Sequence, residues 1–285
     1  MGIYECMHYS FFSPADLDLL KLPADAKERN AIEIINPINQ DLSLMRTTLA
    51  ASMLNAISRN EKQGTLEGRL FEVASIYIPE SLPLTSYPDE RKVLCVGTFG
   101  NNESFFTMKG IANTIAESMD IESTYEPVQK SFLHPYQAVK VLCEGTEIGY
   151  FGKAAYDIQN ELSMRTSAYI MELDLKELSR WYGKKRTFQP ISKFQEEKRD
   201  LAFVMDKNIS CGDVENCIRE ANKYVKEIRL FDVYEGGQIP EGKKSMAFTV
   251  TFAPKEEAFD FEKVQKFVEK ICKKLQNEFN IELRG

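Results

Sequence analysis

The sequence predicts an α+β protein of two domains, in which a domain of strands and helices (residues 1–188) is followed by a ferredoxin-like βαββαβ domain (residues 189–285). The first domain is indicated by a strand–helix–strand unit within residues 31–79, and the second by the order of strand and helix patterns after residue 192. The chain has 285 residues, which is long enough for two buried cores. The expected linker is Gly183–Arg186, because a basic run beside glycine usually lies in solvent.

The strand–helix–strand unit is the part of the first domain around which the rest is expected to be layered. Residues 31–35 and 70–78 read as strands, and a helix is expected between them from about Leu44 to Asn60. Asp41 or Ser43 can cap this helix, since either side chain can accept a hydrogen bond from an N–H of the first turn.

Apolar residues recur along this helix at Met45, Leu49 and Met53, and a second apolar row lies beside them. The combined stripe is wider than a single contact with a sheet requires, so we expect the helix to be covered on two sides. Two interpretations stay open at this point. The stripe belongs to an ordinary core helix, or its adaptable methionines form a docking surface.

The last domain shows strands, helices and turns in the order β-α-β-β-α-β. The expected strands are residues 199–205, 228–234, 245–252 and 281–284. A helix opened by Ser210 and Asp213 is expected after the first strand, and a long helix through Phe261 and Phe279 before the last. Large apolar residues alternate with small or polar ones in residues 245–252. One face of the sheet should therefore pack on the helices while the other stays open.

Composition and missing motifs exclude several functions. A net charge of −7 gives no basic excess, so any RNA contact must use a local patch. Phosphate-binding, dinucleotide, nucleophile-elbow and zinc-protease motifs are absent, and two histidines make a histidine-based metal site or triad unexpected. No catalytic residue and no metal ligand are predicted. Six scattered cysteines and the lack of a membrane-spanning apolar run indicate a reduced, cytoplasmic protein.

Several weak motifs, in order, resemble those of one family. Asn36-Pro37, Leu44–Leu49 and Leu70–Val73 look like the catalytic-like domain of the bacterial phenylalanine–tRNA ligase beta chain. The run Phe231–Tyr234, followed by Gly236, Pro240, Gly242 and Ser245, is similar to the signature of the family's anticodon-binding domain. The resemblance covers nearly all 285 residues. It implies a class II aminoacyl-tRNA synthetase-like first domain, with an antiparallel sheet and helices, and a ferredoxin-fold anticodon-binding second domain.

The resemblance also implies partners. They are the alpha subunit, phenylalanine tRNA and the remaining N-terminal modules of the same beta chain, so Met1 is expected to mark a cut within a longer protein. In the family the corresponding helices pack at the alpha–beta interface, which makes Met45, Leu49 and Met53 the candidate interface residues. The strand at residues 70–78 runs directly into Pro79 without an arginine that could grip ATP. This fragment should therefore be inactive alone and hold no cofactor, while the whole enzyme uses ATP and magnesium.

The candidate RNA site lies on the open sheet face of the last domain. Asp232, Tyr234 and Ser245 are expected to meet the anticodon, because a tyrosine beside polar groups suits one unstacked base. The basic candidates for phosphate contacts are Lys243, Lys244, Arg229 and Lys198. The simpler alternative is that the tyrosine merely ends a strand. At the level of function, the alternative is a catalytically dead regulatory or scaffold protein with a small-molecule-sensing ferredoxin-like domain.

Overall fold

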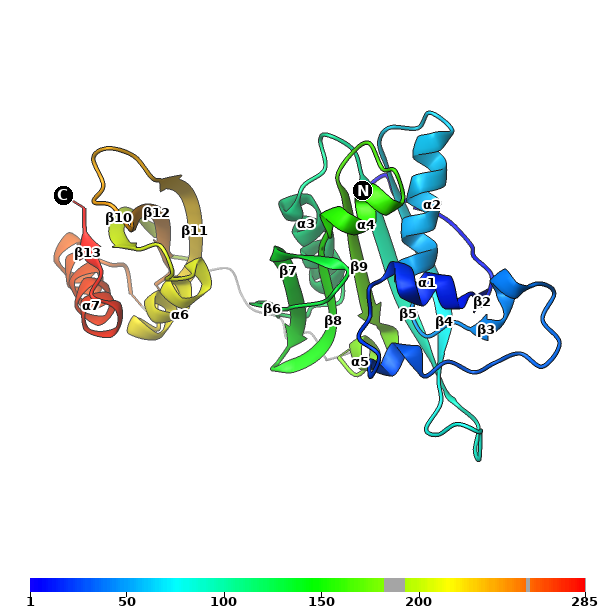
Figure 1. Cartoon of the computed structure of the whole chain (residues 1–285). Helices are drawn as coiled ribbons and strands as arrows, with labels where there is room; N and C mark the ends of the chain where they lie inside the picture. Colours follow the sequence, from blue (N-terminus) through cyan, green and yellow to red (C-terminus); the bar gives the residue numbers. More distant parts are fainter. Residues whose placement is uncertain (182–192, 255–256, 285) are drawn as a thin grey trace. The chain divides into compact units, whose positions relative to one another are not determined.

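The computed structural model describes residues 1–181, 193–254 and 257–284, and the chain forms two compact units, residues 1–186 and 187–285 (Figure 1). Both units combine helices with antiparallel sheets, which confirms the predicted α+β class. The predicted linker, Gly183–Arg186, lies outside the described residues. The division at residue 188 therefore stays a prediction.

The first unit is built on a seven-stranded sheet in the order β1-β4-β5-β9-β8-β7-β6. Its strands are β1 (Tyr4–Glu5), β4 (Gly68–Ile78), β5 (Asp89–Phe99), β6 (Ser123–Pro127), β7 (Leu133–Cys143), β8 (Thr146–Ala154) and β9 (Ala168–Asp174). Neighbouring strands are antiparallel except for β1, which pairs in parallel with β4 at the edge. A short second sheet joins β2 (Phe11–Phe12) to β3 (Leu44–Met45).

Helices cover both faces of this sheet (Figure 1). They are α1 (Pro14–Leu19), α2 (Ala50–Lys62), α3 (Phe105–Ser118), α4 (Tyr156–Glu161) and α5 (Leu175–Ser179), with 3-10 turns η1 (Lys27–Arg29) and η2 (Gln40–Leu42). Cys95 and Phe99 of β5 belong to the core beneath α2, whereas Val96 belongs to the core beneath α3. The alternation of side chains along each strand produces these two separate cores. The helix α2 also contacts α1, as the width of its apolar stripe predicted.

The start of α2 differs from the prediction. The helix begins at Ala50 rather than near Leu44, because Leu44 and Met45 pair with β2 instead. Arg46 then holds the following segment against β4, where its Nε donates to the carbonyl oxygen of Ser75 at 2.8 Å. These contacts join residues far apart in the sequence, and they override the local helical pattern.

The predicted caps of α2 and the strand before it are also wrong. Neither Asp41 nor Ser43 caps α2, whose N-cap residue is Leu49 and makes no capping bond with its own side chain. Its backbone N–H donates instead to Glu172 Oε1 of β9 at 2.6 Å. In residues 31–35 the structure shows an isolated bridge between Glu33 and Leu44 rather than a strand.

The second unit has the ferredoxin-like order predicted from the sequence. Its elements are β10 (Glu197–Asp206), α6 (Cys211–Ala221), β11 (Val225–Tyr234), β12 (Lys243–Phe252), α7 (Phe261–Phe279) and β13 (Glu282–Leu283), and the sheet order is β11-β12-β10-β13. Met246, Phe248, Val250 and Phe252 are at most 2% exposed and lie in the core with residues of α6 and α7. The predicted alternation in β12 is confirmed. Within residues 193–254 and 257–284, both helices pack on this one face and no helix covers the opposite face of the sheet.

Candidate nucleic-acid interface

The pairing of β11 with β12 places Tyr234 directly opposite Ser245 and Asp232 opposite Ala247. Between them, Val233 lies opposite the core residue Met246. Since neighbouring side chains point to opposite faces, Tyr234 and Asp232 lie on the face away from the helices. The expected alignment of the tyrosine with the serine is confirmed.

A β-bulge at Phe231 determines which other side chains reach this face. Arg229 pairs with Thr249 and Asp232 with Ala247, so one residue of β11 has no counterpart between them. Residues three apart in a regular strand would face opposite sides of the sheet. The bulge therefore brings Arg229 and Asp232 to the same side, and it leaves Phe231 itself 53% exposed.

Tyr234 has a cationic neighbour that the sequence interpretation missed. The guanidinium carbon of Arg284 lies 5.8 Å from the centre of the Tyr234 ring, within the range of a cation–π contact. Arg284 Nη2 also donates to Gln238 Oε1 at 3.1 Å, and its backbone N–H donates to Ala202 at 2.7 Å. The sequence did place residues 281–284 in a final strand. The contact with β11 was not visible, because β12 and β10 lie between these two edge strands.

The environment of Ser245 corrects one part of the prediction. The side chain is on the predicted face, but the residue is only 4% exposed. Tyr234, Ser245, Val204 and Glu282 form one row across the sheet, and the Tyr234 and Arg284 side chains meet above that row. Ser245 therefore cannot contact a base while the tyrosine occupies its present position.

The predicted basic residues are not gathered around Tyr234. Lys243 lies opposite Asp206 on the same face as Ser245, whereas Lys244 lies opposite the core residue Met205 and so belongs to the helix side. Lys198 shares the open face but pairs with Thr251. Thr251 is six residues along β12 from Ser245, so Lys198 lies roughly 20 Å away from it at a strand rise of about 3.4 Å per residue.

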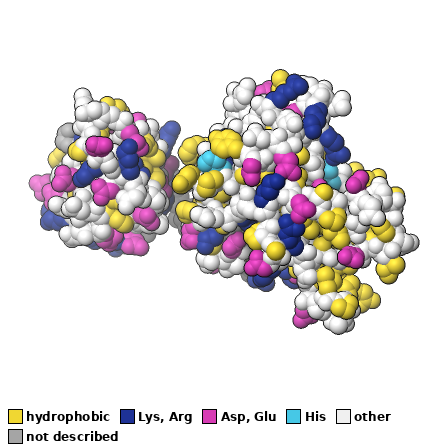
Figure 2. All heavy atoms as spheres, in the orientation of Figure 1, with side chains coloured by type: hydrophobic (Ala, Val, Ile, Leu, Met, Phe, Trp, Pro, Cys, Tyr) yellow, Lys and Arg dark blue, Asp and Glu magenta, His cyan; other side chains and the backbone are white. Residues whose placement is uncertain are grey.

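The charge around the tyrosine is mixed. Lys207 Nζ and Glu235 Oε2 form an ion pair at 2.7 Å, and the hydrogen bond from Lys207 lowers the pKa of the Glu235 carboxyl below its usual range. On the one face of the molecule that Figure 2 presents, Lys and Arg side chains are interspersed with Asp and Glu. The site can thus offer one ring for stacking and a few cations, of which Arg284 is the nearest.

The predicted subunit-interface residues of the first unit are mostly core residues. Leu49 and Met53 are 0% exposed, and only Met45 is half-buried. Met53 lies directly on β5, since a Cβ atom added to Gly97 would come within 2.7 Å of Met53 Cγ. The interface prediction is therefore wrong for Leu49 and Met53, because a buried side chain cannot contact a partner. The alternative interpretation, an ordinary core helix, describes them correctly.

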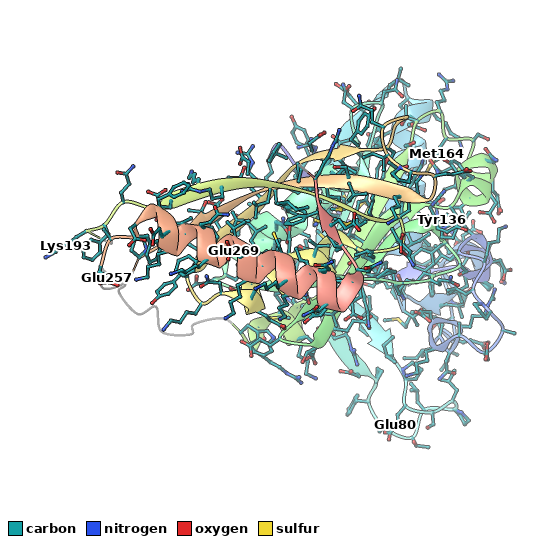
Figure 3. The ribbon with its side chains drawn as sticks, turned by 90° about the vertical axis from the view of Figure 1, so that its left-hand side faces the viewer. Glu80, Tyr136, Met164, Lys193, Glu257 and Glu269 are labelled. Carbon is teal, nitrogen blue, oxygen red and sulfur yellow. The ribbon has the colours of Figure 1, made fainter. Side chains whose placement is uncertain are left out.

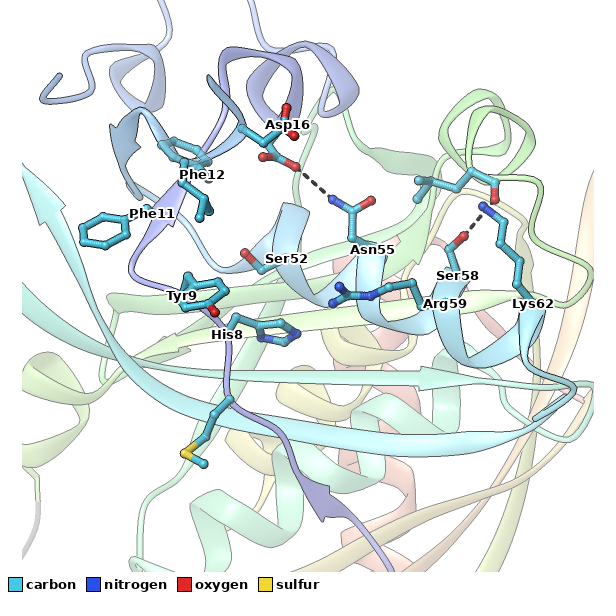
Figure 4. A pocket seen from close by; sticks show the side chains of 14 residues that line it. His8, Tyr9, Phe11, Phe12, Asp16, Ser52, Asn55, Ser58, Arg59 and Lys62 are labelled. Carbon is cyan, nitrogen blue, oxygen red and sulfur yellow. Dashed lines mark hydrogen bonds between the residues drawn. The ribbon is translucent and has the colours of Figure 1, made fainter. Parts of the chain in front are cut away.

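A different side of α2 is accessible (Figure 4). It lines a cleft together with the segment around β2, and the lining residues include Tyr9, Phe11, Asp16, Asp41, Ser52, Asn55, Arg59 and Lys62. Asn55 Nδ2 donates to Asp16 Oδ1 at 2.9 Å and ties the helix to α1. The cleft combines aromatic rings, two cations and two carboxylates, which is a mixture suited to a protein partner.

A buried ionic network fixes the segment that borders this cleft. Glu72 of β4 accepts from His8 Nδ1 at 2.6 Å, from the His8 backbone N–H at 3.1 Å and from Arg46 Nη1 at 3.2 Å. Arg46 Nη1 also donates to the carbonyl oxygen of Tyr9 at 3.1 Å. Burial alone raises the pKa of the Glu72 carboxyl, but these bonds and charges hold it below its usual range. The network therefore attaches residues 8 and 9 to the sheet.

Acidic side chains surround Arg91 in the cleft beside the hairpin of β4 and β5. Arg91 on β5 is held by Asp89 and by Asp174, whose Oδ2 accepts from Nη1 at 3.3 Å. The surrounding cleft is also lined by Glu147, Glu172 and Glu177. Carboxylates thus outnumber the cation, which gives this cleft an acidic character.

Residues 1–181, 193–254 and 257–284 lack two features that are typical of membrane proteins and of metalloproteins. Within these ranges no helix combines the length and the apolar character needed to cross a bilayer. The same residues contain no group of three or more His, Cys, Asp and Glu that could hold a metal ion.

Comparison with known families first defines the class of protein. Residues 1–175 match the phenylalanyl tRNA synthetase beta chain CLM domain, and residues 192–284 match the ferredoxin-fold anticodon binding domain. Both units are thus modules of a tRNA synthetase. The chain belongs to the family of phenylalanyl tRNA synthetase beta chains.

Curated relatives match along nearly the whole chain. The phenylalanine–tRNA ligase beta subunit of Clostridium tetani is 34% identical over 286 residues, covering 99% of this chain and 36% of its own length. That of Clostridium acetobutylicum is 30% identical over 286 residues with the same coverage. The chain therefore spans about a third of the length of these relatives. Among solved structures, the pyrrolysyl tRNA synthetase PylSc of Desulfitobacterium hafniense has a TM-score of 0.49 and 14% identity, covering 62% of each chain.

Proposed function

We propose that this chain is the non-catalytic C-terminal part of a phenylalanine–tRNA ligase beta subunit. In this proposal it docks the catalytic alpha subunit and binds the anticodon region of phenylalanine tRNA during ATP-dependent charging. ATP and magnesium are used by the whole enzyme in the cytoplasm and are not held by this fragment. The remaining N-terminal modules of the beta chain complete the assembly.

The observation that carries the RNA-binding part is the position of Tyr234. This residue is 39% exposed on the sheet face away from α6 and α7, and the guanidinium carbon of Arg284 lies 5.8 Å from the centre of its ring. An aromatic ring beside an arginine is a common platform for an unstacked base, because the ring stacks and the cation attracts phosphate. Asp232 and Arg229 share this face and can contact the flanking nucleotides. Lys243 and the more distant Lys198 are the remaining phosphate candidates on it.

The accessible side of α2 supports the docking part. Its cleft offers Arg59 and Lys62 next to Tyr9 and Phe11, and it is fixed in place by the Glu72 network. In this proposal the partner contacts these residues rather than the buried methionine stripe. The acidic surroundings of Arg91 support a non-catalytic role, since this cleft lacks a free cation for phosphate.

Two measurements test this function. The chain should co-purify with a phenylalanine–tRNA ligase alpha subunit when the two are expressed together. The chain alone should show no phenylalanine-dependent exchange of pyrophosphate into ATP. Exchange by the isolated chain would overturn the non-catalytic assignment. Binding of an amino acid in calorimetry without any tRNA binding would instead favour a regulatory protein.

A further inference from the structure

A second surface with aromatic side chains lies in the first unit, where β7 leaves its partner strand. Leu133 pairs with Ala154 and Ala138 pairs with Gly152, so the residues between positions 133 and 138 do not follow the regular ladder. Gly152 permits this path, because a Cβ atom there would lie 2.6 Å from the carbonyl oxygen of Gln137. A bulge of this kind redirects side chains out of the sheet.

The residue that the bulge presents most openly is Tyr136, which is labelled in Figure 3 and is 90% exposed. Two more rings continue from it, first that of His134 and then that of Tyr156. The ring centre of His134 is 6.1 Å from that of Tyr136 and 5.3 Å from that of Tyr156, the 58% exposed first residue of α4. Exposed aromatic rings that gather on a surface indicate a binding site, since burying them in a complex is favourable.

The polar atoms of these residues are arranged as donors. The backbone N–H of Tyr136 donates to His134 Nδ1 at 3.2 Å, so this nitrogen is the acceptor and Nε2 carries the proton. Lys153 Nζ lies 3.2 Å from the hydroxyl oxygen of Tyr156 and 4.6 Å from the centre of its ring. An ammonium can only donate, so the Tyr156 hydroxyl keeps its own proton for an external acceptor. Because Lys153 is only 8% exposed, it holds the Tyr156 hydroxyl in place rather than contacting a ligand itself.

We propose that His134, Tyr136 and Tyr156 form a binding site for one unstacked nucleotide of single-stranded RNA. The base stacks on Tyr136, and the imidazole N–H and the phenol O–H donate to the adjacent phosphate. A single tyrosine that is 90% exposed and lies near two donors matches a nucleotide better than a protein segment, which would need a continuous apolar contact. The cation that contacts these donors, Lys153, is 8% exposed, so stacking should contribute more than charge. The proposal rests on the proposed function in one respect: it takes RNA to be a ligand of this chain.

The test uses the whole 285-residue chain and a fluorescein-labelled oligouridine of about ten nucleotides, within the usual site size of single-strand binders. Tyr136→Ala should weaken binding about 5- to 150-fold, the range that loss of one stacked base produces. Tyr136→Phe keeps the ring and should bind as the original protein does. Tyr87→Ala is the matched control, because Tyr87 is a 98% exposed tyrosine on the hairpin between β4 and β5.

The same titration in a Tyr234→Ala background separates this site from the one in the second unit. The effect of Tyr136→Ala should persist there at similar size, since the two residues belong to different units. If Tyr136→Ala changes affinity no more than Tyr87→Ala in both backgrounds, while Tyr234→Ala weakens binding, the nucleotide site is refuted and the proposed function stands. If Tyr136→Ala leaves RNA binding intact but abolishes co-purification of the alpha subunit, the surface binds protein and the proposal is wrong.

Discussion

Glu172 of β9 accepts a hydrogen bond from the backbone N–H of Leu49, 123 residues earlier in the chain, at 2.6 Å. The same carboxylate accepts from the Thr48 hydroxyl at 2.9 Å and from the Tyr150 hydroxyl. Burial and the neighbouring carboxylate raise the pKa of the Tyr150 hydroxyl well above its usual range, so it remains a donor. A buried acid from a distant strand thus supplies the cap that α2 lacks in its own sequence.

Glu172→Gln should destabilise the first unit by about 1–3 kcal/mol, because the amide leaves buried donors at the start of α2 poorly matched. Urea unfolding followed by the fluorescence of Trp181, the only tryptophan of the chain, measures this unit. The control is Glu147→Gln, since Glu147 is exposed on β8. Equal midpoints for the two variants would show that the cap contributes little.

The Glu72 network makes stability depend on pH. The pKa of the Glu72 carboxyl is lowered in the folded chain, so the unfolded chain binds this proton more tightly. The stabilisation is present above the unfolded pKa of about 4.3 and is lost as the pH falls through the lower folded value. Glu72→Gln should therefore flatten the decline in unfolding free energy between about pH 5 and pH 3. Urea titrations across this range, with Glu147→Gln as control, test it, and parallel curves would contradict it.

Loss of the Tyr234 ring should weaken tRNA binding by the reassembled alpha–beta enzyme. Tyr234→Ala is expected to cost about 1–3 kcal/mol if one base stacks there. Arg284→Ala should weaken binding less and reduce its dependence on salt, because a phosphate contact releases counterions. Affinity is measured with wild-type and anticodon-substituted tRNA. Unchanged affinity and unchanged anticodon discrimination in Tyr234→Ala would refute this site.

Reversing the charge of Arg59 should weaken docking of the alpha subunit. Arg59 is exposed in the cleft beside α2, so Arg59→Glu changes the surface without altering the core. The amount of alpha subunit that co-purifies is expected to fall by at least about tenfold, the equivalent of roughly 1.4 kcal/mol. Arg219→Glu makes the same charge change at an exposed position of α6. Equal recovery with both variants would place the interface elsewhere.

Local sequence signals were sufficient for the second unit. The alternation in β12 placed Phe248 and Phe252 in the core, and Ser210 accepts from the Asp213 N–H at the start of α6, as expected. In the first unit the same reasoning placed the start of α2 six residues too early. Residues 44–49 owe their conformation to β2, β4 and Glu172, and no periodicity within the segment contains that information.

The candidate site was predictable to a similar degree. The turn between β11 and β12 fixes which residues oppose one another, so the pairing of Tyr234 with Ser245 could be anticipated. The burial of Ser245 and the approach of Arg284 could not, because both depend on long side chains that meet across two intervening strands. Of the two interpretations of the apolar stripe of α2, the core helix describes the buried Leu49 and Met53 correctly and the docking surface does not. Periodicity shows that a face is covered and not what covers it.

Because of the bulge at Phe231, the number of residues in β11 decides which side chains face away from the helices. Deleting that single codon would keep every charged residue of the strand, yet regular pairing would then turn either Arg229 or the pair Asp232 and Tyr234 toward the helices. The loss of one residue would thus change which charged and aromatic side chains lie on the exposed face of the sheet, an effect comparable to several simultaneous substitutions. Insertions and deletions in this edge strand are therefore expected to be far less tolerated than changes of residue type at the bulge.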